Sequence, residues 1–260
     1  MKKNLLCFLL AALLLAACAS APEEQTELQT AAQTETAVPT ESATPTETTV
    51  PPTTVPQITA PEELSALLEQ SGITLQELES LDCRQLMTVV SDGYTATLAL
   101  YNLDSYHWQR QDDLSCDGFV GKKGTNPQKQ EGDKCSPQGL FPILDAFYSY
   151  DAPQTGLDSF QVIEGTYWVD DPNSAYYNQR VIGTENKDWR SAERMWLNPD
   201  LYKYGFVIGY NMEYIPNAGS AIFFHISDGY TAGCVATDEA SLLAYLAALS
   251  TENNPYILIY

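Results

Sequence analysis

The stretch from Ala19 to Ile58 most constrains the fold of this chain. It is rich in Thr, Glu, Pro, Ala and Gln, and it has no aromatic and no basic residue. Such a composition cannot bury enough apolar area to offset the entropy lost on ordering, so we expect residues 18–58 to form an unfolded tether. The hydrophobic core must therefore come from residue 59 onward.

Residues 1–17 have the pattern of an export signal. Two lysines precede an apolar run that is too short for a comfortable membrane span. The run ends in Leu15-Ala16-Ala17-Cys18, which resembles the bacterial lipoprotein signal. We expect lipidation at Cys18 and export to the outer face of a bacterial membrane, with the lipid as the only membrane anchor. A stop-transfer helix or an ordinary signal peptide is the alternative.

Charge and histidine content exclude several classes of function. The chain has 13 Lys+Arg and 34 Asp+Glu, a formal net charge of -21, which argues against nucleic acid as a partner because phosphates must be neutralised. His107 and His225 are the only histidines, so a multi-histidine metal site is excluded. We expect no metal and no cofactor.

The remaining sequence predicts a mostly β, α+β domain with short helices. Hydroxyl-to-glutamate spacings at Thr59 and Thr74 resemble capping boxes and predict two short helices in a lead-in over residues 59–82. A hairpin is expected over residues 84–101, with later strands at 161–169, 204–210, 220–225 and 256–260. A last helix is expected over residues 238–249, with Thr237 as its N-cap.

Residues 217–237 carry the candidate chemistry. An apolar strand ends in His225, a short polar loop turns, and small residues then present Cys234 just before a helix. A thiol reacts as the thiolate, and its pKa falls beside an imidazole or a helix N-terminus. His225 is the expected general base, and the backbone N–H groups of Gly233 and Cys234 are the expected oxyanion donors.

The same region resembles the catalytic domain of the L,D-transpeptidase (YkuD-like) family, in its branch with a short His-to-Cys loop. The two specific blocks are Gly219-Ser220-Ala221-Ile222-Phe223-Phe224-His225 and Thr231-Ala232-Gly233-Cys234-Val235. Upstream blocks agree with the alignment: Glu131-Gly132-Asp133, Ser136-Pro137-Gln138-Gly139, Tyr167-Trp168-Val169-Asp170-Asp171, Tyr177-Asn178 and Tyr210-Asn211. The resemblance covers residues 84–260 and implies a β-sandwich with short flanking helices over residues 83–260.

The resemblance implies acyl transfer on peptidoglycan stem peptides and a role in cell-wall organisation and cell shape. Cys234 would attack the bond between the third and fourth stem residues, expel the terminal D-residue and form a thioester that a neighbouring stem amine resolves. A backbone carbonyl at Ile226 or Ser227 would orient His225. With water as acceptor the same site is a carboxypeptidase, and a wall-binding lipoprotein without turnover is the third hypothesis.

The sequence departs from the family pattern at the cysteine. Ala236 stands where relatives commonly have an arginine, and TAGC replaces SHGC. Tyr210, Thr231 and Arg180 are the candidate substrate-binding residues. Arginine suits a substrate carboxylate, and the further candidates for that contact are Arg190, Arg194 and Lys203.

The other thiols have separate interpretations. Cys116 and Cys135 flank a polar loop in a domain expected to be exported, so a disulfide between them is a hypothesis. Cys83, at the head of a predicted strand, is expected to be a buried apolar residue.

Overall fold

The computed structural model describes residues 56–260. The predicted signal peptide, the predicted lipidation site Cys18 and nearly all of the predicted tether lie outside the described residues. The predicted lead-in and catalytic domain fall within one compact unit. No helix among residues 56–260 has the length and hydropathy needed to cross a bilayer.

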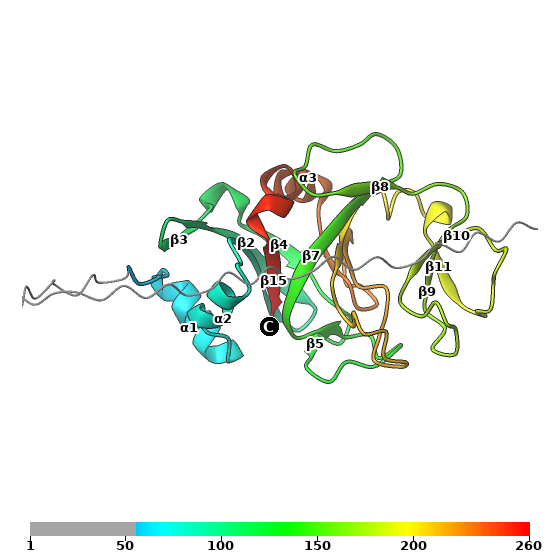
Figure 1. Ribbon diagram of the computed structural model, residues 1–260, viewed down its shortest axis with the longest axis horizontal. Coiled ribbons are helices and arrows are strands. Elements are labelled where there is room, and N and C mark those ends of the chain that lie inside the picture. The colour runs from blue at the N-terminus through cyan, green and yellow to red at the C-terminus, as the bar shows by residue number, and fades with distance from the viewer. Residues whose placement is uncertain (1–55) are drawn as a thin grey trace, which may run out of the picture. The chain divides into compact units, whose positions relative to one another are not determined.

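A ten-stranded sheet forms the centre of the fold (Figure 1). Neighbouring strands follow the order β1-β15-β7-β12-β13-β14-β4-β2-β3, and β8 pairs with β7 outside this path. Because β1 also pairs with β2, the sheet closes around one core. Its strands are β1 (Gln85–Asp92), β2 (Thr95–Asp104), β3 (His107–Arg110), β4 (Cys116–Phe119), β7 (Gly139–Tyr148), β8 (Ser159–Gln161), β12 (Tyr204–Ile208), β13 (Phe223–Ile226), β14 (Val235–Thr237) and β15 (Pro255–Ile259).

The remaining elements are short and pack around this sheet. A three-stranded sheet has the order β10-β9-β11, and β5 pairs with β6. These strands are β5 (Thr125–Asn126), β6 (Ser136–Pro137), β9 (Thr166–Val169), β10 (Arg180–Ile182) and β11 (Ala192–Arg194). The helices are α1 (Glu62–Ser71), α2 (Leu75–Ser80) and α3 (Glu239–Ala248), with 3₁₀ turns η1 (Asp112–Leu114), η2 (Met195–Leu197) and η3 (Thr251–Asn253). The prediction of a mostly β fold with short helices is confirmed.

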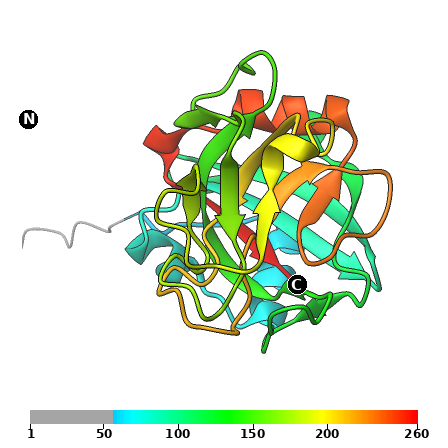
Figure 2. The same ribbon diagram turned by 90° about the vertical axis from the view of Figure 1, so that its right-hand side faces the viewer.

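Alternation of side chains along the strands separates three apolar clusters. The interior cluster lies inside the closed sheet and includes Phe224, Val235 and, from α3, Leu242. A second cluster lies on the outer face of β1, β2 and β15, where α1 and α2 cover it. The third lies on the outer face of β7, β12 and β13, under the segment that contains β9 and β11. Figures 1 and 2 show these two coverings on opposite sides of the sheet.

The observed helix caps match the caps predicted from the sequence only in part. Thr74 caps α2, since its hydroxyl accepts a hydrogen bond from the N–H of Glu77 as predicted. Pro61, not Thr59, precedes α1, because the Thr59 hydroxyl bonds the ring of His107 at 2.7 Å. The cap of α3 is Asp238 rather than Thr237, because Thr237 still belongs to β14 and donates to the carbonyl of Asp117.

The strand predictions also needed correction. The predicted hairpin forms, with β1 and β2 in register from Gln85↔Asn102 to Asp92↔Thr95. The predicted strand 161–169 breaks into β8 and β9, because a turn hydrogen bond joins Thr166 to Ile163 and Gly165 has a φ of 84°. Strand β7, which pairs with β15, β12 and β8, was not predicted.

Candidate active site

Two neighbouring strands place His225 and Cys234 on the same face of the sheet. β13 and β14 are parallel, with Phe224 opposite Val235 and His225 opposite Ala236. Phe224 and Val235 point into the interior cluster. Alternation therefore turns His225, and Cys234 at the start of β14, to the outer face. Cys234 packs there against the cluster that contains Phe223.

The backbone fixes the orientation and tautomer of His225. Its Nδ1 lies 2.9 Å from the carbonyl oxygen of Ile226, and a carbonyl can only accept a hydrogen bond. Nδ1 therefore carries the proton, and Nε2 has the lone pair that a general base needs. Of the two predicted orienting carbonyls, Ile226 has this contact. The hydroxyl of Ser227 instead donates to the carbonyl of Gly229 and accepts from its N–H, which braces the following loop.

The thiol of Cys234 is held by backbone groups at the start of β13 and just before it. Sγ donates to the carbonyl of Ala221 at 3.3 Å and accepts from the N–H of Phe223 at 3.4 Å. Ala221 has a φ of 54°, an uncommon conformation for a residue with a side chain. Among the hydrogen bonds of residues 56–260, none joins Sγ to the ring of His225, so proton sharing between them stays a prediction.

Both groups are neutral in the resting protein. Burial raises the pKa of the Cys234 thiol to about 12, against the N–H of Phe223 and the charge of Lys129, while the charge of Glu193 raises it further. Burial also lowers the pKa of His225, against the carbonyl of Ile226. The expected helix N-terminus does not act on the thiol, because β14 separates Cys234 from α3. The arrangement suits proton transfer during attack rather than a preformed ion pair.

A polar and aromatic layer covers this pair. The ring of Tyr202 lies with its centroid 6.2 Å from that of His225 and 5.9 Å from that of Phe223. The Tyr202 hydroxyl donates to Glu193 on β11 at 3.0 Å. Burial raises the pKa of Glu193, and hydrogen bonding to Tyr202 only partly opposes this. The Trp168 ring on β9 meets Phe223 edge-on at 5.0 Å.

The Glu131 carboxylate connects the upstream motif to the residues just before β13. Its Oε2 accepts hydrogen bonds from the hydroxyls of Tyr177 at 2.6 Å and Ser220 at 2.7 Å. The Tyr177 oxygen in turn accepts from the N–H of Gly219. Asn178 extends the network, because its Oδ1 accepts from the N–H of Ala221. These contacts fix the segment whose carbonyl holds the thiol.

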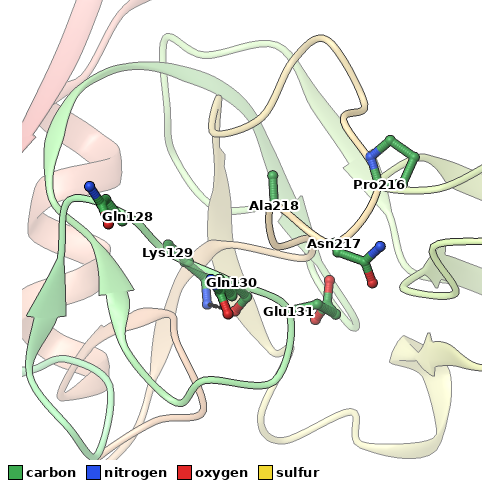
Figure 3. A pocket seen from close by; sticks show the side chains of 7 residues that line it. All are labelled: Gln128, Lys129, Gln130, Glu131, Pro216, Asn217 and Ala218. Atoms are coloured by element: carbon green, nitrogen blue, oxygen red, sulfur yellow. Dashed lines mark hydrogen bonds between the residues drawn. The ribbon is translucent and has the colours of Figure 1, made fainter.

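A surface depression of about 540 Å³ lies beside this network. Figure 3 shows its two sides, Gln128 to Glu131 on one and Pro216 to Ala218 on the other. A hydrogen bond from the N–H of Glu131 to the carbonyl of Asn217, 2.9 Å long, joins the two sides.

Two predicted contacts are corrected by the loop before Cys234. The N–H of Gly233 donates to the Thr231 hydroxyl at 3.1 Å, so it is not open to a developing oxyanion. The Thr231 hydroxyl donates to the carbonyl of Cys234, and the residue is buried. Thr231 therefore braces the loop and does not face a substrate. The N–H of Cys234 stays a predicted oxyanion donor.

The other two predicted substrate-binding residues, Tyr210 and Arg180, make no hydrogen bond to the thiol among those of residues 56–260. Tyr210 and Arg180 line a smaller depression of about 280 Å³ together with Trp168. The Tyr210 hydroxyl is used within its own loop, where it donates to the carbonyl of Ala218. Arg180 is exposed, and its guanidinium stacks 3.8 Å from the centre of the Phe160 ring.

The cation next to the thiol is Lys129, which the sequence reasoning missed. Arg190 and Arg194 are exposed, and Lys203 pairs with Glu239 at the surface. The available signal was the spacing of Lys129 four residues before Asp133, directly beside the quoted Glu131 block. Nothing in that spacing indicates that the side chain reaches the cysteine.

The hypothesised disulfide between Cys116 and Cys135 is absent, and both thiols are free. Cys116 begins β4, where its sulfur contacts the hydroxyls of Thr237 and Tyr245. Cys135 lies beyond the other end of β4, beside the backbone of Gly121. Extended chain rises about 3.3 Å per residue, so the run from 116 to 121 separates the two sulfurs beyond bonding distance.

Comparisons with known proteins add little to this geometry. No family model matches the chain, and no curated protein matches it. The structure is similar to one described as the helical cell shape determining protein Pgp2 from Campylobacter jejuni, with a TM-score of 0.38 and 12% identity. The similarity covers 67% of this chain and 46% of that one, so the chain spans less than half the length of that protein.

Proposed function

We propose that this protein is an exported, lipid-anchored L,D-transpeptidase that cross-links peptidoglycan stem peptides through a cysteine thioester. The observation that carries the proposal is the shared outer face of β13 and β14. It turns Cys234 to the same face as a histidine whose Nδ1–H is held by a backbone carbonyl. The motif resemblance supplies the substrate class.

In the proposed reaction His225 transfers one proton in each of two half-reactions. Nε2 takes the proton of the Cys234 thiol as Sγ attacks the carbonyl carbon between the third and fourth stem residues. The amine of the departing D-residue then takes that proton, and the C–N bond breaks to leave a thioester. An acceptor amine gives a proton to Nε2, attacks the thioester carbonyl and releases the sulfur, which regains the proton.

The neutral resting pair is suited to this sequence. A thiol with a raised pKa gives a strong nucleophile once its proton is removed, and a neutral imidazole is the form that removes it. The Cys234 sulfur must leave the carbonyl of Ala221 to react, which a rotation about its own side-chain bond can achieve.

The test incubates the purified chain with a tetrapeptide stem and identifies the products by mass spectrometry. A cross-linked dimer supports transpeptidation, and tripeptide without dimer assigns the same acyl-enzyme to hydrolysis. Unchanged substrate together with retained binding to wall material would leave a binding module and overturn the proposal.

A further inference from the structure

A buried ammonium lies beside the nucleophile. Within residues 56–260, Lys129 is the one lysine or arginine that the structure buries, with a side chain 4% exposed. Lysine is almost never fully buried unless it is paired. The buried ammonium of Lys129 therefore needs a polar or charged partner, and its burial needs an explanation.

Asp133 is the partner. Lys129 Nζ lies 2.9 Å from Asp133 Oδ1 and also donates to the carbonyl of Gln130 at 3.3 Å. Although burial opposes ionisation, hydrogen bonds from the N–H groups of Cys135 and Gln130 and from Lys129 hold the pKa of Asp133 below its usual value. Asp133 is thus ionised and anchored. Two of the three N–H groups of Lys129 have an acceptor within the described residues.

Two glycines make room for the lysine at the active-site segments. A Cβ at Gly219 would lie 3.0 Å from Lys129 Cε, and one at Gly233 would lie 3.3 Å from Nζ. Gly219 precedes the segment that holds the thiol, and Gly233 is bonded directly to Cys234. The ammonium therefore lies against the peptide that carries the nucleophile.

We propose that Lys129 is a positioning residue that acts through Cys234: its ammonium stabilises negative charge on the sulfur. In catalysis, which rests on the proposed function, the same charge stabilises the oxyanion that follows. A positive charge from Lys129 would compensate for two departures of this site from the expected pattern. Ala236 stands where family members have an arginine, and the N–H of Gly233 is occupied by Thr231.

The other titratable groups near Cys234 determine how much of the effect of Lys129 on the thiol is opposed. Glu193 raises the pKa of the thiol, whereas Lys129 lowers it. His225 is neutral through burial, and Tyr202 stays protonated because burial and the charge of Glu193 raise its pKa. Asp170, whose pKa is raised mainly by burial, is a further acidic group whose charge acts on Tyr202. Lys129 is the cation in this set.

The experiment measures the rate at which iodoacetamide alkylates Cys234 in the full chain, from pH 7 to 10, by peptide mass spectrometry. Lys129→Met should slow alkylation about three- to tenfold at every pH. A rise of one unit in the thiol pKa lowers the thiolate fraction tenfold, and the greater nucleophilicity of a more basic thiolate recovers part of this. Lys129→Arg keeps the charge and should restore the rate.

Two further variants keep the test independent of folding. Lys129→Met with Asp133→Asn removes both charges and leaves no unpaired buried carboxylate, and it should show the same slowing. Lys203→Met removes a surface lysine paired with Glu239 and should leave the rate unchanged. Folded Lys129 variants that react like the parent protein would overturn the inference. Because alkylation needs no stem peptide, this result is independent of whether the protein transfers acyl groups.

Discussion

The two outer faces of the closed sheet each carry a cysteine, buried on one face and partly exposed on the other, and the groups around these two cysteines differ. On the face covered by α1 and α2, Cys83 is 1% exposed among leucines, and its S–H donates to the carbonyl of Gln85. On the face covered by β9 and β11, Cys234 shares the outer face of β13 and β14 with His225 and lies near Glu193 and Lys129.

The effect of burial on the pKa does not distinguish these thiols, although Cys83 is buried and Cys234 is partly exposed. Burial raises the pKa of Cys83 to about 12, as it does for Cys234. The nearby charge on Cys83 is that of Asp82, which also raises the pKa. From this difference we predict that a reactive thiol depends on its neighbours: an oriented imidazole and a buried cation are present on one face and absent from the contacts of Cys83 on the other.

The strongest test of this comparison replaces each of the two cysteines by alanine in turn. Cys234→Ala should lower tetrapeptide turnover about 10⁴-fold or more, because the nucleophile is lost. Because members of the family that the sequence resembles react with carbapenems, we also expect a carbapenem adduct on the parent protein, and Cys234→Ala should abolish it. Cys83→Ala should retain both. Turnover by liquid chromatography and intact mass give the two readouts, and an adduct that survives Cys234→Ala would refute the assignment of the nucleophile.

The next largest effect concerns the base. His225→Gln should lower kcat/KM about 10²- to 10⁴-fold, the usual contribution of a general base. In the parent protein the base must be neutral, so activity should fall as pH drops through the pKa of His225. Burial lowers that pKa, which places the acid limb below about 6.5.

The matched control for this prediction is His107→Gln. His107 is exposed on β3 and bonds the Thr59 hydroxyl near the helix-covered face. A pH profile of kcat/KM measured for all three proteins checks the assignment. An acid limb that persists in active His225→Gln, or that disappears in His107→Gln, would contradict the role given to His225.

A smaller effect is expected from the charge of Glu193, which opposes that of Lys129 at the Cys234 thiol. Glu193→Gln removes a negative charge that raises the thiol pKa, and a glutamine oxygen can still accept from Tyr202. Alkylation of Cys234 should become about 1.5- to twofold faster above pH 8, as expected for a fall of a few tenths of a unit in the thiol pKa. The exposed Glu164→Gln serves as control. Slower alkylation in Glu193→Gln would show that the carboxylate acts in another way.

The sequence predicted the parts of this fold whose signals are local. The hairpin β1–β2 follows from two β-rich runs around a turn, and Thr74 caps α2 because its glutamate is three residues away. Strand β7 was missed because Gly139 and Pro142 read as loop residues. A partner strand on each side overrides that local preference.

The residues of the candidate site also divide into those with a local sequence signal and those without one. Cys234 and His225 were found because they lie nine positions apart in one motif. Lys129 and Glu193 were missed because each comes from a separate segment, and folding alone brings them to the face of β13. The Gly233 N–H was assigned to an oxyanion because its capture by the Thr231 hydroxyl depends on the path of the loop.

The smallest effect tests whether Cys83 is only a packing residue. Cys83→Ala removes one buried atom from the cluster under α1 and α2, which should lower the free energy of unfolding by about 1 kcal/mol. Urea unfolding of the full chain measures this change, and the alkylation rate of Cys234 should stay the same. A slower reaction at Cys234 would mean that the helix-covered face influences the other across the interior cluster, and the two faces would then not be independent.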